Sequence, residues 1–584
     1  MCGIVGVLAE KNAASMAFAA LKRLEYRGYD SWGVAFKGGK SIEVLKKTGK
    51  LPESFSFQAG SGTALAHTRW ATHGKVTEAN AHPHLSNDKT IAVVHNGIIE
   101  NHEELKHFLE GKGFSFNSET DTEIIPNLIQ LFMGEGQSFK EAVRLSLKKI
   151  DGSYAVVAMH AGERELVAAR NGSPLVIGLG KHSIFAASDV PAFLDHAKKV
   201  VYLNDFEMAL LGKKAEFFDV LTGKQLEKDV EEVNWSIEQA QKGEFPHFML
   251  KELNEQRFTI KKAVQQPKGI IEKVSSMIKN AKGVFFVGCG TSYHACVSSA
   301  YIFSHVAKMH VNVVLASEFR NYEEFLEKET LVIAVSQSGE TADVLDAVKT
   351  AKKRSSKVVS IVNVMGSSLT RLSDETIMMN SGPEICVLST KSYTSQLAIL
   401  LLLAYVVAGK QVEGHELVEK AAALSQKVID ESSAPAKELA ARLKNSRDFF
   451  LIGRDLAFPS ALEGALKIKE VSYIHAEGFA GAELKHGTIA LVEEGIPCIV
   501  FSTDQTRPLI MSNAQELKSR GAFIIGIDSK PNKLFDYFFR VEEVGNANPV
   551  LMILPIQLLA YHLAVEKKLD PDKPRNLAKS VTVK

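Results

Sequence analysis

The sequence predicts an α/β protein in which one sheet-and-helix domain precedes two doubly wound parallel sheets. The chain has 584 residues, more than one hydrophobic core holds, so several domains are expected. Up to about residue 215, short apolar runs are broken by Gly, Asn and Asp. Beyond about residue 263, apolar strands alternate with helical stretches in a pattern that occurs twice, which is typical of parallel sheets covered on both faces.

The first domain combines strands with two helices. The runs "CGIVGVL", "TALAHTR", "IAVVHNGI" and "SYAVVAMH" are typical of strands, and residues 15–24 and 119–132 carry apolar side chains at helical spacing. From about residue 220 to 263 the chain turns polar and charged, which indicates a domain junction. The predicted boundaries are 2–216 for the first domain, 217–262 for a linker, 263–412 and 425–570 for the parallel-sheet domains, and 571–584 for a C-terminal tail.

The two parallel-sheet domains are predicted to be copies of one unit. Three pairs of strand-end residues share nearly the same offset, 165, 166 and 165 positions: Gly288 and Gly453, Ser336 and Ser502, and Asn363 and Asp528. Ligands of doubly wound sheets bind beyond the carboxyl ends of the strands, where "CGTS" and "SQSGET" both fall. A binding site is therefore expected at this edge of the first copy.

The composition excludes several classes of protein. With 69 Lys and Arg against 68 Asp and Glu, no charge excess indicates a nucleic-acid or anionic-membrane partner. The five cysteines are scattered without a CxxC pair, so neither a disulfide framework nor a zinc site is predicted, and a reducing cytoplasm is the expected setting. The start of the chain is a poor signal peptide, and the apolar run at 397–409 is too short to span a membrane, so a buried helix is expected there.

The motif "SQSGET" predicts a phosphate cradle. Ser336, Ser338 and Thr341 offer hydroxyls, and the following helix offers free backbone N–H groups at its start. The alternative is a Ser/Thr-rich helix cap that holds no ligand. "CGTS" adds Thr291 and Ser292, whereas the matching stretch of the second copy, "STDQTRPL", lacks the pattern. One copy is thus expected to bind phosphate and the other to have diverged.

The second copy contains a helix with ionisable residues on one face. In "SALEGALKIKEVSYIHAE", Glu463, Lys467 and Glu470 stand at i, i+4 and i+7. A solvated stripe of salt bridges would have the same spacing. His486, in the nearby "AELKHG", is a candidate acid or base near neutral pH.

Cys2 is a candidate nucleophile. Removal of Met1 is favoured before a small residue, and it would leave a thiol and a free α-amine on one residue. A cysteine at such a position usually has no role, but polar loops elsewhere complete a site. Arg69 can bind an α-carboxylate, Asp121 an α-amine, and Asn96 with the Gly97 N–H an oxyanion. Together they predict a site that cleaves the amide of an amino acid.

The chain closely resembles the glutamine–fructose-6-phosphate aminotransferase (isomerising) family, the glucosamine-6-phosphate synthases. The resemblance rests on "MCGIVGV", "EYRGYDSWG", "HTRWATHG", "HNGIIEN", "SQSGETAD", "STKSYTSQL", "ALEGALKIKE", "ELKHG" and "PRNLAKSVTV", which occur in order along the whole chain. It implies an N-terminal Ntn-hydrolase glutaminase domain of αββα architecture, followed by two sugar isomerase (SIS) domains. It also implies the use of L-glutamine to convert D-fructose 6-phosphate into D-glucosamine 6-phosphate plus glutamate, the first step of the hexosamine pathway.

The resemblance assigns residues to the glutamine site. Cys2 would attack the glutamine amide, its own α-amine would act as base, and Asn96 with Gly97 would form the oxyanion hole. The positions that match the family's glutamine-binding residues are Arg69, Trp70, Thr72, His73 and Asp121, and the tryptophan would also gate an ammonia channel.

The resemblance also assigns a sugar site. Its binding positions are Thr291, Ser292, Ser336, Gln337, Ser338, Thr341, Val387 and Ala578. Lys579 matches the Schiff-base lysine, Glu470 the base that moves the C1 proton to C2, and Lys467 an assisting lysine. Without the resemblance, Lys579 would be interpreted as a solvated lysine of a terminal tail. His486 matches a ring-opening histidine lent by the neighbouring subunit, which implies a homodimer without metal or redox cofactor.

Departures from the family are small, and two rival functions stay open. "NEQR" at 254–257 replaces the commoner E-Q-P, and the long inserted loop of eukaryotic enzymes is absent. The resemblance therefore implies a bacterial-type enzyme without feedback by the UDP-sugar product. One rival is a fused SIS enzyme that acts on a different sugar phosphate or amine adduct. The other is a sugar-phosphate sensor whose SIS domains bind without turnover.

Overall fold

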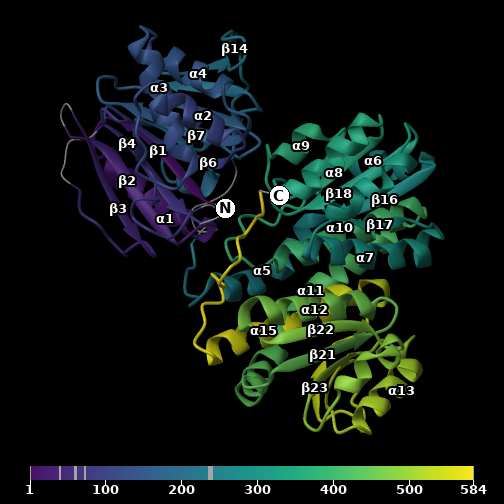
Figure 1. The fold of residues 1–584 in the computed structure, drawn as a ribbon. Helices are drawn as coiled ribbons and strands as arrows, with labels where there is room; N and C mark the ends of the chain where they lie inside the picture. Colours follow the sequence, from purple (N-terminus) through teal and green to yellow (C-terminus); the bar gives the residue numbers. More distant parts are fainter. Residues whose placement is uncertain (1, 39–40, 58–61, 71–73, 234–240, 583–584) are drawn as a thin grey trace. The chain divides into compact units, whose positions relative to one another are not determined.

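The computed structural model describes residues 2–38, 41–57, 62–70, 74–233 and 241–582, which form two compact units (Figure 1). One unit comprises residues 1–240 together with 578–584, and the other comprises residues 241–577. Each unit is described separately below.

The first unit contains two antiparallel sheets. The eight-stranded sheet has the order β15-β11-β9-β10-β1-β4-β2-β3, with β1 (Gly3–Ala9), β2 (Ser31–Gly38), β3 (Ser41–Thr48), β4 (Thr63–Arg69), β9 (Val176–Leu179), β10 (Ser183–Ala187), β11 (Lys199–Tyr202) and β15 (Glu231–Glu232). The seven-stranded sheet has the order β14-β13-β12-β8-β7-β6-β5, with β5 (His84–Leu85), β6 (Ile91–Ile99), β7 (Gly152–His160), β8 (Leu166–Asn171), β12 (Glu207–Leu211), β13 (Ala215–Asp219) and β14 (Gln225–Leu226). The described helices of this unit are α1 (Ala13–Arg23), α2 (His102–Glu110), α3 (Ile124–Gly134), α4 (Phe139–Lys148) and the short 3-10 segments η1 (Glu25–Arg27), η2 (Asp121–Glu123) and η3 (Val190–Ala192).

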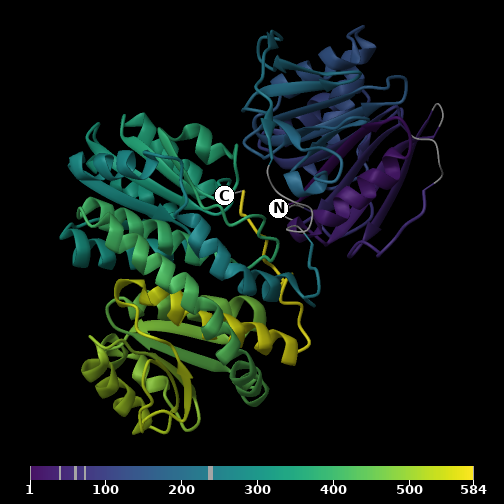
Figure 2. The same cartoon turned by 180° about the vertical axis from the view of Figure 1, so that it is seen from behind.

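Strand alternation builds the four layers of this unit. In β6, Val94 faces a core that it shares with Ile4 of β1, so this core lies between the two sheets. Its neighbour Val93 faces the opposite way and packs with Leu109 of α2 and Leu128 of α3. Helix α1 packs on β1 and β4 at the other side (Figures 1 and 2). The result is the predicted helix–sheet–sheet–helix order.

The polar stretch predicted as a linker, 217–262, is ordered at both of its ends. It contains the end of β13, then β14 and β15, which pair at the edges of the two sheets. Its last part begins α5 (Phe248–Ala263), which packs in the second unit. Edge strands keep one side in water, so their polar composition resembles that of a linker. The second predicted helix also differs, because Asp121–Glu123 forms a 3-10 turn before α3 begins.

The second unit contains two five-stranded sheets, and each is entirely parallel. The first has the order β17-β16-β18-β19-β20, with β16 (Gly283–Gly288), β17 (Asn312–Leu315), β18 (Thr330–Ser336), β19 (Lys357–Val362) and β20 (Glu375–Met378). The second has the order β22-β21-β23-β24-β25, with β21 (Asp448–Gly453), β22 (His475–Ala480), β23 (Pro497–Phe501), β24 (Phe523–Asp528) and β25 (Tyr537–Arg540). The two orders are the same once the strands are counted from the first of each sheet, which confirms the predicted internal repeat.

Helices cover both faces of these sheets (Figure 1). They are α5, α6 (Ile270–Asn280), α7 (Thr291–Ile302), α8 (Ala342–Lys353), α9 (Ser368–Leu372), α10 (Lys391–Val407), α11 (Gln411–Leu443), α12 (Ala457–Ser472), α13 (Arg507–Lys518), α14 (Asn548–Met552) and α15 (Leu554–Glu566), with the short segments η5 (Phe303–Ala307), η6 (Ala316–Phe325), η7 (Glu483–His486), η8 (Thr488–Leu491) and η9 (Gly545–Ala547). One continuous hydrophobic core, which includes Leu401 of α10, Leu439 of α11, Ile468 of α12 and Leu558 of α15, joins the two copies.

The apolar run that was expected to form a buried helix does so, because it lies within α10 and most of its side chains are buried. A second stretch, Gly545–Glu566, is long and apolar enough to cross a membrane by length and composition, but 89% of it is buried inside the protein. Both stretches supply the shared core of the second unit.

Candidate active sites

The pairing of β1 with β4 places Cys2 beside Trp70. Gly3 lies opposite Thr68 in this antiparallel pair, so the residue before β1 meets the residues that follow β4. The Trp70 backbone N–H donates to Cys2 Sγ over 3.2 Å. A donor at this distance stabilises negative charge on the sulfur, as a thiolate nucleophile requires.

Asn96 and Gly97 are neighbours in β6, and Asn96 contacts Cys2. Asn96 Nδ2 donates to the Cys2 carbonyl oxygen over 2.9 Å and to Ser188 Oγ over 3.1 Å. Gly97 has a φ of +137°, and a Cβ built on it would lie 2.0 Å from the Ser153 carbonyl oxygen. Only glycine fits such a backbone. One candidate oxyanion donor, Asn96, thus contacts the residue of the candidate nucleophile, and the other, Gly97, follows it in the strand.

The two charged groups predicted to hold the glutamine lie at or against strand ends in this unit. Arg69 ends β4, is 4% exposed, and donates to the carbonyl oxygens of Gly74 and Lys75 over 3.4 and 3.2 Å. Burial lowers the pKa of Arg69, while the nearby Cys2 and the carboxylates around it oppose that shift. Asp121 accepts the backbone N–H of Ile99, which ends β6, over 2.8 Å.

The structure therefore gathers most of the predicted glutamine site in the first unit. The residues that it brings together by these contacts are Cys2, Arg69, Trp70, Asn96 and Asp121, and Gly97 directly follows Asn96. Thr72 and His73 lie outside the described residues.

The predicted phosphate cradle is a compact turn between β18 and α8. Ser336 Oγ accepts the Gly339 N–H over 3.0 Å and lies 3.2 Å from Thr341 Oγ1, while Ser338 Oγ accepts the Glu340 N–H over 3.2 Å. Gly339 has a φ of +66°, and a Cβ there would meet Ser367 Oγ at 2.1 Å. The hydroxyls of this turn, which also includes Gln337, lie at the N-terminus of α8, where anions are favoured.

The turn after β16 adjoins the cradle and also touches the second copy. Ser292, at the start of α7, accepts a hydrogen bond from Gln396 Nε2 of α10 over 3.1 Å. Its neighbour Thr291 accepts one from Lys467 Nζ of α12 over 3.0 Å. The carboxyl ends of β16 and β18 flank the position where the strand order reverses, which is where doubly wound sheets bind their ligands.

Lys467 is fully buried between two carboxylates. Its Nζ lies 3.3 Å from Glu463 Oε1 and 2.7 Å from Glu470 Oε2, and it donates to the Ser389 carbonyl oxygen over 3.3 Å. Although burial alone lowers the pKa of a lysine, the two carboxylates outweigh it and raise the pKa of Lys467. Lys467 is therefore an ammonium ion here, and the solvated stripe of salt bridges is excluded for this face.

Two further residues of this network were not assigned a role from the sequence. Glu463 is 0% exposed and accepts from Thr291 Oγ1 over 3.1 Å, and His294 Nδ1 donates to its other oxygen over 2.8 Å. The spacing of Glu463 and Lys467 in the sequence had indicated that the Glu463 carboxylate lies on the same helix face as the lysine. Nothing in the sequence pointed to His294, because it belongs to the other copy of the repeat.

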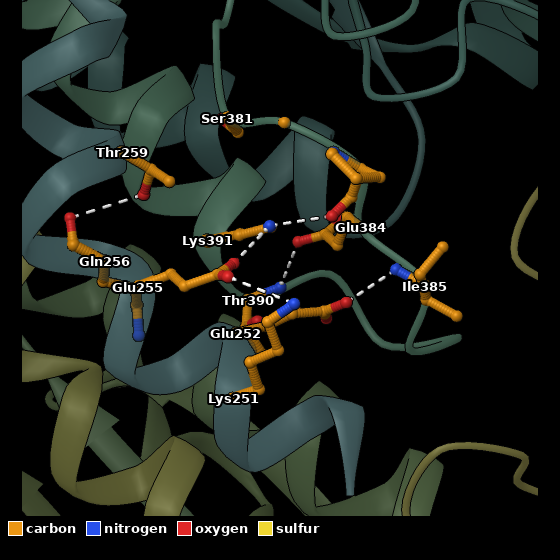
Figure 3. Close-up of polar contacts among 12 residues, drawn as sticks. Lys251, Glu252, Glu255, Gln256, Thr259, Ser381, Glu384, Ile385, Thr390 and Lys391 are labelled. Carbon is orange, nitrogen blue, oxygen red and sulfur yellow. Dashed lines mark hydrogen bonds and ion pairs between the residues drawn. The ribbon is translucent and has the colours of Figure 1, made fainter. Parts of the chain in front are cut away.

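Val387 lies in a loop that carboxylates hold in place (Figure 3). Glu252 of α5 accepts the backbone N–H groups of Ile385 over 2.6 Å and Cys386 over 3.2 Å. Glu384 accepts the N–H groups of Thr390 and Ser392, each over 3.0 Å. Figure 3 shows α5 and this loop facing each other across the network. The sequence had indicated only a polar junction at the position of α5.

The chain after α15 is tied to the same loop and helix. Asp572 accepts the N–H groups of Phe248 and Met249 at the start of α5, each over 2.8 Å, and its carbonyl oxygen accepts the Val387 N–H over 3.1 Å. The Arg575 N–H donates to the Tyr473 hydroxyl over 2.7 Å, and its guanidinium lies 4.2 Å from that ring centre. Tyr473 follows α12 directly.

Three predicted sugar-site residues are not joined to the others by these contacts. Ala578 and Lys579 group with the first unit, and both are half-buried. His486 is exposed at the end of η7 and makes no hydrogen bond or ion pair with the described residues. The roles predicted for all three stay predictions.

The equivalent turn of the second copy contains ion pairs between its own side chains. Arg507, at the start of α13, forms ion pairs with Asp528 at 2.5 Å and with Asp504 at 2.6 Å. Hydrogen bonds to Asp528 raise the pKa of Arg507 further. The Arg507 guanidinium is already paired with these two carboxylates, and the carboxylates would repel an anion. This turn is therefore unsuited to phosphate, as the missing motif predicted.

Comparisons with known proteins assign these regions to families. A glutamine amidotransferase domain matches residues 67–195, and a SIS domain matches residues 277–406 and 442–567. Glutamine–fructose-6-phosphate aminotransferase [isomerizing] from Thermococcus kodakarensis is 46% identical, with 100% of both chains covered. This chain belongs to that aminotransferase family.

Other aminotransferases of this family match equally completely. The proteins of the same name from Pyrococcus horikoshii and Clostridium acetobutylicum are 44% and 42% identical, again over 100% of both chains. The C-terminal domain of glucosamine-fructose-6-phosphate aminotransferase from Francisella tularensis matches with a TM-score of 0.53 and 32% identity, covering 57% of this chain and 100% of that one. Glucosamine-6-phosphate deaminase from Thermotoga maritima matches with a TM-score of 0.50 and 27% identity, over 57% and 99%.

Proposed function

We propose that this chain transfers the amide nitrogen of L-glutamine to D-fructose 6-phosphate and forms D-glucosamine 6-phosphate and glutamate. The observation that carries the proposal is that one chain combines two sets of reactive groups. A thiol flanked by oxyanion donors lies in the first unit, and a hydroxyl-lined helix N-terminus lies beside a buried lysine–carboxylate network in the second. Relatives named for this reaction match over the full chain.

The first half-reaction releases ammonia. Cys2 Sγ attacks the amide carbon, and the oxyanion that forms accepts hydrogen bonds from Asn96 Nδ2 and the Gly97 N–H. The C–N bond breaks, ammonia leaves with the proton taken from the thiol, and water cleaves the thioester to give glutamate. Arg69 and Asp121 bind the α-carboxylate and α-amine, and Trp70, Thr72 and His73 complete the glutamine site. The α-amine of Cys2 serves as the base.

The second half-reaction combines ammonia with the sugar. Thr291, Ser292 and the cradle at 336–341, with Gln337 included, bind the phosphate and hydroxyls, and the Val387 and Ala578 backbones complete the site. His486 of a neighbouring subunit opens the sugar ring. Water leaves C2 as the imine with the Lys579 amine forms, ammonia then replaces that amine at C2, and Glu470 moves a proton from C1 to C2. Lys467 holds charge and does not form an imine, since its pKa is raised.

Lys579 supplies the amine that activates C2. Arg575 is anchored at Tyr473, three positions after Glu470, and Lys579 is only four positions after Arg575. An extended chain spans about 3.3–3.6 Å per residue, so Lys579 can reach the end of α12 that carries the proposed base. A lysine that is partly desolvated there is a suitable imine-forming group.

The domain boundaries, assembly and setting complete the proposal. The glutaminase domain spans 2–216, the SIS domains 263–412 and 425–570, and the active-site tail 571–584. A homodimer follows from the sharing of His486, which is exposed in the single chain. All five cysteines are free thiols, which suits a cytoplasmic enzyme.

An assay for glucosamine 6-phosphate with glutamine and fructose 6-phosphate tests this function. The wild-type chain is expected to form the amino sugar, Cys2→Ala to lose it together with glutamine hydrolysis, and Lys579→Ala to lose it while still hydrolysing glutamine. Borohydride with fructose 6-phosphate is expected to trap an adduct on the wild type only. Binding of the sugar without product would favour the sensor, and a different accepted sugar would favour the rival SIS enzyme.

A further inference from the structure

We propose that His67 is the positioning residue of the oxyanion hole, because it holds the Asn96 amide with its N–H groups toward Cys2. The proposal rests on the proposed glutaminase reaction. His67 lies in β4 of one sheet, and Asn96 lies in β6 of the other. Their side chains meet in the layer between the sheets, where His67 is 0% exposed.

The hydrogen-bond partners of His67 determine which ring nitrogen carries its proton. Nε2 lies 3.2 Å from the His95 carbonyl oxygen and 3.0 Å from Asn96 Oδ1. A backbone carbonyl oxygen only accepts, so Nε2 must carry the hydrogen. Burial lowers the pKa of His67 to about 3, so the ring is neutral and has a single N–H near neutral pH. That N–H is shared by the two oxygens.

The same reasoning determines how the Asn96 amide is oriented. Its Oδ1 accepts from His67, so its Nδ2 must occupy the opposite corner. There Nδ2 donates to the Cys2 carbonyl oxygen and to Ser188 Oγ. Ser188 Oγ also accepts the Ile4 N–H over 2.9 Å. If the amide were rotated by 180°, Oδ1 would face the Cys2 carbonyl oxygen and Nδ2 would face the His67 donor, so both contacts would be lost.

The ring of His67 is itself held in place. It stacks on His82 with 4.1 Å between ring centres and 11° between planes. His82 Nδ1 accepts the His95 backbone N–H over 3.3 Å. Burial also lowers the pKa of His82, so the stacked rings are both neutral and do not repel each other. Backbone and ring contacts therefore determine the direction of the His67 N–H before substrate binds.

Orientation in advance is what an oxyanion hole requires. The donor must point at the place where negative charge develops, because reorientation during the reaction would cost part of its effect. Without His67, the Asn96 amide would lose the donor on its Oδ1 side and would be held only by the Cys2 carbonyl oxygen and Ser188 Oγ. Arg69 and Asp121, which are proposed to bind the glutamine, do not depend on this hydrogen bond.

The test compares His67→Phe with His67→Gln. Phenylalanine keeps the stacking surface and removes the donor, whereas the amide nitrogen of glutamine can take the place of Nε2. We expect His67→Phe to lower kcat for glutamine hydrolysis about 10- to 100-fold, less than the loss of a whole donor, with KM changed less than about threefold. His67→Gln should recover most of that loss. An unchanged KM for glutamine, which binds in the same unit as His67, serves as the control for folding.

A double-mutant cycle with Asn96→Ala separates positioning from a general structural effect. If His67 acts through Asn96, His67→Phe should cost less than about threefold in the Asn96→Ala background. An equal loss in both backgrounds, a wild-type rate in His67→Phe, or no recovery in His67→Gln would overturn the proposal. Failure of the wild-type chain to hydrolyse glutamine would instead refute the proposed function, so the two failures are distinguishable.

Discussion

Two lysines show how the surroundings of a single residue set its charge. Lys467 is completely buried, yet two carboxylates in contact raise its pKa. Lys46 is half-buried at the wall of a cavity of about 730 Å³ in the first unit, where burial outweighs the influence of Glu123 and lowers its pKa to about 8. Within the described part of the chain, its Nζ donates only to the Ala79 carbonyl oxygen, over 3.4 Å. Burial alone therefore does not predict which lysine is neutral.

Lys46 should be the more reactive lysine of its strand near pH 8. About half of its side chains are then neutral, whereas an ordinary lysine with a pKa of about 10.4 is almost wholly charged. Labelling with acetic anhydride, followed by mass spectrometry, should give a midpoint near pH 8 for Lys46, with Lys47 as the comparison because it pairs with Glu78 at 3.1 Å. A midpoint near 10 would contradict the assignment.

The same shift has a consequence for stability. Since the folded pKa of Lys46 lies below its unfolded value, the folded state loses the proton first as the pH rises. The group therefore costs stability below about pH 8, and this cost fades between about pH 8 and 10.4.

Two matching helices of the repeat show why phosphate is proposed to bind at the N-terminus of one and not of the other. Thr341 precedes α8, and Thr506 precedes α13 at the matching place in the other copy. Each threonine hydroxyl contacts another hydroxyl, Ser336 Oγ at 3.2 Å and Thr503 Oγ1 at 2.9 Å, respectively. The helix start is similar in both, but only α13 has Arg507 paired with acidic neighbours. The side chains around the turn, and not the helix itself, make the difference.

Removing hydroxyls from the α8 turn should weaken sugar binding. Ser338→Ala and Thr341→Ala each delete a hydrogen bond to a charged phosphate, which is worth about 1.5–3 kcal/mol, so the Kd for fructose 6-phosphate should rise about 10- to 100-fold. Thr506→Ala is the matched control and should leave the Kd unchanged. Isothermal titration calorimetry measures all three. Unchanged affinity in both α8 variants would indicate that this turn is a helix cap that binds no ligand.

Across the whole molecule, the two units have separate hydrophobic cores. Residues of β1, β4, β6 and β7 share one core in the first unit, and helices α10, α11, α12 and α15 share another in the second. A ligand stabilises only the structure that binds it, so each substrate should report on its own unit.

Hydrogen exchange should therefore separate the two substrates. In Cys2→Ala, which binds glutamine without cleaving it, glutamine should slow exchange in peptides from β4 and β6. Fructose 6-phosphate should slow exchange around Ser336–Thr341 and at the start of α7. Mass spectrometry of peptides resolves these segments. Protection of the 336–341 turn by glutamine alone would contradict the assignment of substrates to units.

Much of this architecture could be predicted from the sequence because the evidence is local. The offset between Gly288 and Gly453 predicted the duplicated sheets, and "SQSGET" at a strand end predicted where β18 meets α8. These are properties of short segments, and a short segment has much the same preference for helix, strand or turn wherever it lies in the fold. The resemblance to the family then assigned most of the site residues.

The remaining features depend on contacts between distant segments. His294 and Glu463 are 169 positions apart, and only folding brings α7 against α12. The carboxylate of Glu252 lies in what looked like a linker, because the charges that hold a buried loop resemble those of an exposed one. His67 was passed over for the same reason, since its partner Asn96 belongs to a different sheet.

The contact between α7 and α12 bears on how the chain arose. Each of these helices follows the first strand of its own sheet, so the two are counterparts, and they pack against each other. Two identical ancestral subunits facing each other in this way would have had two equivalent sites across a twofold axis. Fusion of two such subunits would have allowed the halves to diverge: the first has the turn proposed to bind phosphate, while the second has Arg507 paired with Asp528 and carries Lys467 and Glu470. On this view, the proposed asymmetric sugar site descends from one of the two equivalent sites of a symmetric dimer.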